Sequence, residues 1–124
     1  MNIKACPIET SIKYIGKKWS INILRDLFRG KKRFIEFLKE NPKLSTKMLS
    51  ARLKELEKNQ LVEKRIIQKS PIIAVYHLTE KGRALKNILY ELSIFSINQY
   101  SSDVFADVRL KNEMVNHAKK MFNQ

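Results

Sequence analysis

Hydrophobic residues recur every three or four positions along most of the chain, the spacing of one face of a helix. Three isoleucines at this spacing predict a helix over residues 8–15, and Gly16 follows as its end. The same pattern predicts a second helix over residues 19–28, with Gly30 as its stop. A short third helix is expected to begin at Phe34.

A fourth, longer helix carries the clearest signals. Asn41-Pro42 closes the helix before it, because the residue that precedes a proline is disfavoured in the helical conformation. Ser45 is a natural N-cap, and a stripe of three leucines follows at spacings of four and three. The helix is predicted to run to about Lys58, where Asn59 and Gln60 replace an expected glycine and Asn59 can tolerate the left-handed cap conformation.

The pattern then changes to that of β-strands. Residues 61–67 and 73–78 are rich in β-branched and aromatic side chains, and the segment 68–72 between them contains Pro71. These features predict a β-hairpin with a basic tip.

Two further helices are expected after the hairpin. Thr79 is the predicted cap of a long helix, residues 101–103 are read as a break, and a last helix is predicted over residues 104–122. The predicted fold class is therefore mainly α with a small β-hairpin. A short helix, a tight turn, a second helix and a two-stranded wing make a winged helix-turn-helix.

The net charge of the chain indicates what kind of partner it binds. The net charge is +13, and residues 1–78 carry 18 basic and 7 acidic residues against 7 and 5 in residues 79–124. A basic excess suits nucleic acid or an anionic membrane surface, although it can also be a solvated surface that favours solubility. No apolar run reaches membrane-spanning length, and the N-terminus lacks a signal-peptide core, so we expect no membrane contact and a cytoplasmic location.

The chemistry expected of an enzyme is missing from the sequence. It has no glycine-rich phosphate loop, zinc motif or Ser-His-Asp set, and its single cysteine allows neither an internal disulfide nor a thiolate metal framework. We therefore expect no enzyme activity, no metal and no cofactor. A single-stranded RNA reader would need exposed aromatic stacking residues, whereas most of the aromatics here fall in apolar stripes.

Double-stranded DNA is then the expected partner, read by the helix that begins at Ser45. Its outer face is short or basic, which suits close approach to base edges and phosphates, although any amphipathic surface helix has an outer face. The predicted DNA-binding residues of this helix are Ser45, Thr46, Lys47, Ser50, Ala51 and Lys54. The wing is expected to add Arg65 and Lys69, and a basic corner before the third helix is expected to add Lys32 and Arg33.

Six segments in order resemble the HxlR-type winged helix-turn-helix transcription regulators, which have a MarR-like winged helix. They are Cys6-Pro7, Ile15-Gly16-Lys17-Lys18-Trp19, Ile23-Leu24-Arg25-Asp26-Leu27, Gly30-Lys31-Lys32-Arg33-Phe34, residues 49–57 and residues 76–82. The resemblance implies a homodimer, joined through its N- and C-terminal helices, that regulates transcription from a near-palindromic operator. The chain departs from the family pattern at Lys17 and Gln60, where glycine is usual, and at Val75, where glutamate is usual.

The resemblance also sets an expected division of the chain, which we treat as one domain over residues 1–124. Residues 1–18 are expected to form an N-terminal dimerisation arm, residues 19–78 the helix-turn-helix and wing, and residues 79–124 the C-terminal dimerisation helices. Cys6 has two interpretations: family members use a cysteine near this place to sense oxidants or electrophiles, whereas a free cysteine can also be a small hydrophobe buried under the dimer interface. A small-molecule effector of unknown identity is a further expectation.

Overall fold

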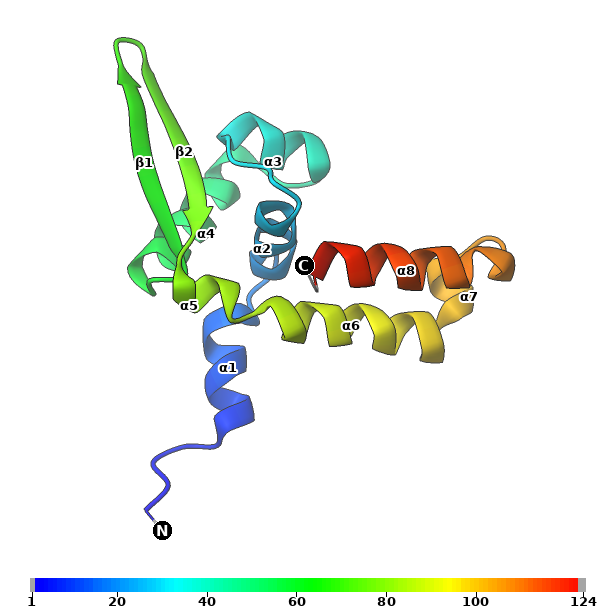
Figure 1. Ribbon diagram of the computed structural model, residues 1–124. Helices are drawn as coiled ribbons and strands as arrows, with labels where there is room; N and C mark the ends of the chain where they lie inside the picture. The colour runs from blue at the N-terminus through cyan, green and yellow to red at the C-terminus, as the bar shows by residue number, and fades with distance from the viewer. Residues whose placement is uncertain (1, 123–124) are drawn as a thin grey trace. The chain divides into compact units, whose positions relative to one another are not determined.

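The computed structural model describes residues 2–122, apart from the side chain of Val108. The chain divides into two compact units, of which the first ends at Arg83 and the second begins at Ala84 (Figure 1). The first unit contains α1 (Pro7–Ile15), α2 (Ser20–Phe28), α3 (Phe34–Glu40), α4 (Thr46–Lys58), β1 (Val62–Lys69), β2 (Ile72–Leu78) and α5 (Glu80–Arg83). The predicted fold class is confirmed: the chain is mainly helical, with a two-stranded antiparallel hairpin.

The core of the first unit collects the apolar faces of its helices and the base of its hairpin. Phe37 of α3 is fully buried and meets Tyr76 of β2 edge to face, with ring centroids 6.2 Å apart. The leucine stripe of α4 is buried as its spacing predicted. Figure 1 shows the outer part of the hairpin projecting away from the helices of the first unit, so only its base can contribute to this core.

Both ends of α4 follow from local side-chain chemistry. The Ser45 side chain accepts a hydrogen bond from the Met48 N–H across 3.1 Å, which confirms the predicted N-cap. Asn59, which could tolerate the left-handed conformation, does not adopt it: its φ is −83°, and the next residue, Gln60, has φ 63°. The chain therefore turns one residue later, at a position where the resembled family usually has glycine, which adopts this conformation without strain.

The hairpin is longer and its turn tighter than predicted. The segment 68–72 was expected to be a turn, but Gln68 and Lys69 belong to β1 and Ile72 to β2. The strands pair from Val62 opposite Leu78 out to Lys69 opposite Ile72, with one irregularity between residues 66 and 68. Pro71 still stands between the strands, where no ladder hydrogen bond is required of it.

The helices after the hairpin are more broken than the pattern suggested. Thr79 does cap, since its hydroxyl accepts from the Gly82 N–H at 3.0 Å, but α5 ends at Arg83 and a separate α6 (Lys86–Gln99) follows. Residues 101–103, read as a break, instead belong to α7 (Ser101–Val104). The apolar spacing runs on across each break, and so the pattern alone cannot reveal it.

The last helix is likewise shorter than the predicted 104–122. Phe105 is buried with extended backbone angles, φ −117° and ψ 135°, which stops α7. The chain then forms the short 3₁₀ turn η1 (Val108–Leu110) and α8 (Lys111–Phe122). Within this second unit α6 and α8 lie side by side (Figure 1). Among the described residues, no helix combines the length and apolar content that a membrane crossing needs.

Candidate nucleic-acid interface

The outer face of α4 is open to solvent, and it carries no acidic side chain as far as Lys54; the exposed Glu57 follows in the last turn. No Asp or Glu occurs between Ser45 and Lys54. The structure leaves Ser45, Thr46, Lys47, Ala51 and Lys54 exposed, and Ser50 half-buried. Because residues three and four apart share a helix face, Lys47, Ala51 and Lys54 lie in one row. The structure thus places the six residues predicted on this helix at its N-cap and within its first three turns.

Two residues that the sequence analysis did not select hold α4 against the loop before α2. The Arg52 guanidinium donates from Nε to the Lys18 carbonyl across 2.8 Å. Glu55, one turn further on, forms an ion pair with Lys17, whose Nζ lies 3.1 Å from Glu55 Oε1. These contacts fix how α4 is oriented, and only the three-dimensional structure brings their partners within reach.

The basic corner before α3 is ordered by one carboxylate. Glu36 accepts hydrogen bonds from the backbone N–H groups of Lys32, at 3.1 Å, and Arg33, at 3.0 Å. These two bonds, with smaller help from nearby cations, lower the pKa of the Glu36 carboxyl below its ordinary value. The Lys32 carbonyl in turn accepts from the Tyr76 N–H at 2.8 Å, which attaches the corner to the hairpin. The side chains of Lys32 and Arg33 remain exposed.

The wing carries its predicted cations, but its outer part is more apolar than expected. Arg65 and Lys69 are both exposed on β1. Arg65 is paired with Glu63 two residues earlier, at 3.1 Å, and this guanidinium lowers the pKa of the Glu63 carboxyl. Three exposed isoleucines, Ile66, Ile67 and Ile72, surround the turn. A phosphate that reached Arg65 would therefore compete with Glu63.

Lys32 and Arg65, which are far apart in the sequence, line one hollow of about 360 Å³ at the base of the hairpin. Lys31 and Arg83 line it as well. Arg83 is held there because α5 sits close to the start of β1: a Cβ on Gly82 would collide with the Leu61 carbonyl. Sequence spacing offered no signal for this grouping, which joins three separate segments.

Cys6 is exposed and stands at the N-cap of α1. Its backbone carbonyl accepts hydrogen bonds from the Thr10 N–H at 3.0 Å and the Thr10 hydroxyl at 2.9 Å. These bonds fix the backbone and leave the thiol out of the helix start. In the single chain the thiol is thus accessible. The other interpretation, burial of Cys6 under a dimer interface, concerns the paired chains.

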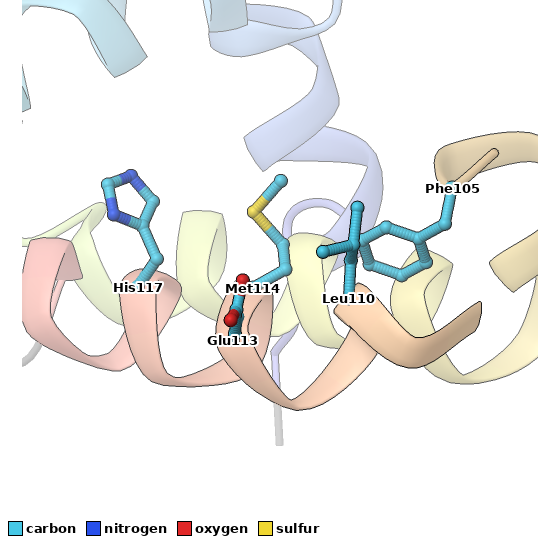
Figure 2. A pocket seen from close by; sticks show the side chains of 5 residues that line it. All are labelled: Phe105, Leu110, Glu113, Met114 and His117. Atoms are coloured by element: carbon cyan, nitrogen blue, oxygen red, sulfur yellow. The ribbon is translucent and has the colours of Figure 1, made fainter. Parts of the chain in front are cut away.

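The second unit presents a number of exposed apolar side chains. Figure 2 shows Leu110, Met114 and His117 pointing to the same side of η1 and α8, where with Phe105 and Glu113 they line a hollow of about 310 Å³. On α6, Ile88, Leu92 and Phe95 are exposed. Exposed apolar groups of this number on a small unit are typical of an interaction surface. Within residues 2–122, no three His, Cys, Asp or Glu side chains come close enough to share a metal ion.

Comparison with known proteins agrees with this arrangement. Residues 14–103 match the family described as HxlR-like helix-turn-helix. The HTH-type transcriptional regulator YodB of Bacillus subtilis is 40% identical over 92 residues, which cover 73% of this chain and 82% of YodB.

Two solved structures are similar in fold as well as sequence. Diamide-treated YodB from B. subtilis aligns with a TM-score of 0.61 at 35% identity and covers 76% of this chain and 94% of its own. The redox regulator HypR in its reduced form aligns with a TM-score of 0.73 at 31% identity, over 81% of this chain and all of its own, 100%.

Proposed function

The chain belongs to the HxlR-like helix-turn-helix family, and on that premise we propose that it is a transcription regulator that binds a near-palindromic double-stranded DNA operator as a homodimer. The observation that carries the proposal is the outer face of α4, which is free of acidic side chains from Ser45 to Lys54. In winged helix-turn-helix proteins the second helix of the motif lies in the major groove, with its N-terminal residues against base edges.

The residues of α4 divide into two roles. Lys47 and Lys54 are long cations on the same face of α4 and would bind phosphates or guanine edges. Thr46, Ser50 and Ala51 are short, so the helix can approach the bases closely. Ser45 stands where backbone N–H groups at a helix N-terminus favour a phosphate.

The wing and the basic corner would bind the sugar-phosphate backbone of the DNA on either side of the bases read by α4. Lys69 stands next to the turn of the projecting hairpin, from which it would reach an adjacent groove. Lys32 and Arg33, set in place by Glu36, would bind phosphates and carry no sequence information of their own. Arg65 would join them once it leaves Glu63.

We assign dimerisation to the two ends of the chain. Residues 1–18 include α1, on which Ile8 and Ile12 are 75% and 57% exposed. Residues 79–124 include α6 and α8 with their exposed apolar side chains, and they carry little net charge. Burying such surface in a symmetric pair would remove it from water, and would set two copies of residues 19–78 to read two half-sites.

The experiment that tests this role of α4 uses a fluorescent duplex and a salt titration of the full chain. Lys47→Ala is compared with Lys120→Ala, which removes the same charge from an exposed position of α8. Each phosphate contact that is lost should reduce the slope of log K against log salt by about one. We expect that reduction for Lys47→Ala alone; equal slopes for both variants would contradict the assignment.

A second function, redox control, is favoured by the accessible thiol of Cys6 and by the redox-related relatives. The chain has one cysteine, so oxidation by a diazene such as diamide can join only two separate molecules. Two thiols give up two hydrogens to form one disulfide, and the diazene is reduced to its hydrazine. We propose that this reaction changes DNA affinity.

Diamide treatment tests redox control directly. Treated wild-type protein should form a disulfide-linked species on a non-reducing gel and change its duplex affinity, and a reducing agent should reverse both. Cys6→Ser should show neither effect. If the duplex affinity of Cys6→Ser responds to diamide as the wild type does, Cys6 has no sensing role.

A further inference from the structure

The hollow at the base of the hairpin concentrates positive charge in a concave place. Four cations line it, from the loop after α2 (Lys31, Lys32), from β1 (Arg65) and from α5 (Arg83). The lysines of α4 stand on a convex helix surface, which suits a DNA duplex. A concave cationic surface instead encloses its ligand and focuses the electrostatic field on it.

The charges of the hollow are not balanced by the protein. Glu63 pairs with Arg65 at 3.1 Å, and Glu40 lies 3.6 Å from Lys31, so two of the four cations face a carboxylate. Lys32 has no ion pair among the described residues, and Arg83 uses Nη1 to donate to the Leu78 carbonyl at 2.9 Å. Two positive charges are thus left without a carboxylate partner, and a dianion would neutralise them.

The walls and the size narrow the class of ligand. Leu27 and Leu78 contribute apolar surface beside the cations. The volume of about 360 Å³ is at the small end of the range for ligand pockets, roughly 300–1,000 Å³. A phosphate group matches the charge of the two uncompensated cations, and a carbon skeleton of about the size of one sugar suits a volume of this order.

We propose that this hollow binds a phosphorylated small molecule, with the phosphate dianion held by Lys32 and Arg83 and the carbon skeleton against Leu27 and Leu78. Arg65 joins the site when the ligand displaces Glu63. This site does not require the chain to bind DNA. If the proposed function holds, Lys32 and Arg65 are shared by the two ligands, and a bound metabolite weakens the hold on the DNA backbone.

Isothermal titration calorimetry of the full chain tests the site, with glucose 6-phosphate as the probe and glucose as its uncharged counterpart. The variant Lys32→Gln/Arg83→Gln removes the two uncompensated cations. The control Lys39→Gln/Lys58→Gln removes two exposed charges of the same unit outside the hollow. Circular dichroism establishes that each variant is folded.

We expect the wild type to bind glucose 6-phosphate and not glucose. The hollow variant should raise Kd about tenfold or more, because hydrogen bonds to charged groups are among the strongest in proteins, while the control stays near the wild type. Glu63→Gln, which frees Arg65 and needs no cation to be removed, should lower Kd by roughly threefold.

Three results would overturn the site. One is no binding heat with glucose 6-phosphate up to about 10 mM. Another is equal weakening in the hollow and control variants, which would mean general surface charge. The third is a hollow variant that loses duplex affinity but keeps its affinity for glucose 6-phosphate; the cations would then serve DNA phosphates, and the proposed DNA-binding function would stand without this site.

Discussion

The side-chain amide of Asn41 donates a 2.7 Å hydrogen bond to the fully buried carboxylate of Asp26. The same amide nitrogen donates to the Phe37 carbonyl at 2.8 Å, and Arg25 Nη2 donates to the other oxygen of the Asp26 carboxylate at 2.9 Å. This cluster ties the end of α2 to the turn between α3 and α4. The orientation of the proposed reading helix therefore depends on a buried charge that is fully hydrogen-bonded.

Asn41→Ala should destabilise the first unit markedly. It removes the donor to one Asp26 oxygen and leaves a buried carboxylate partly unsatisfied, which costs about 2 kcal/mol of unfolding free energy. Urea unfolding followed by circular dichroism measures the change. Asn87→Ala, at an exposed position of α6, is the control and should shift the midpoint little. A shift no larger than that control would mean that the Asp26 cluster does not stabilise the turn.

Glu36 should make the stability of the corner before α3 depend on pH. Its pKa is lower in the folded chain than its ordinary value of 4.5. Its contribution is therefore fully present above pH 4.5 and is lost as pH falls through the lowered folded pKa. Glu36→Gln should unfold at lower urea than the wild type at neutral pH, and the gap should close below the folded pKa. A gap that stays constant with pH would exclude the carboxylate as its cause.

Leu92 of α6 offers a test of the proposed dimer. It is 49% exposed and lies one turn after Ile88, which is 40% exposed. A carboxylate placed there would be desolvated on pairing, so Leu92→Asp should shift sedimentation from dimer toward monomer. Asn98→Asp adds the same charge at another exposed position of α6 and should leave the dimer intact. Dimers of equal strength in both variants would place the interface elsewhere.

The parts of the fold that sequence could predict are those determined by local chemistry. The N-cap at Ser45 and the stop at Gly30, which has φ 87°, are decided by residues within a turn of each other. The two-stranded wing follows from β-branched composition in the same way. In contrast, the breaks at residues 84–85 and 105–107 preserve the apolar spacing, and nothing local distinguishes them from a continuous helix.

The candidate site was predictable to the same extent. A single helix supplies Lys47, Ala51 and Lys54, so their common face could be deduced from spacing. Asp26 looked like one acid among many basic residues, and Arg52 like one more surface cation. Their roles depend on Asn41 and on the Lys18 carbonyl, which only tertiary packing brings near.

Selection of bound fragments from random duplex DNA tests the central claim most directly. A homodimer that reads DNA through α4 should enrich two inverted half-sites whose centres lie about 34–36 Å, or a multiple of that, apart on one face of the duplex. The enriched sequence should bind Lys47→Ala more weakly than the wild type. Recovery of no common sequence, or of a single unpaired site, would contradict a symmetric sequence-specific regulator.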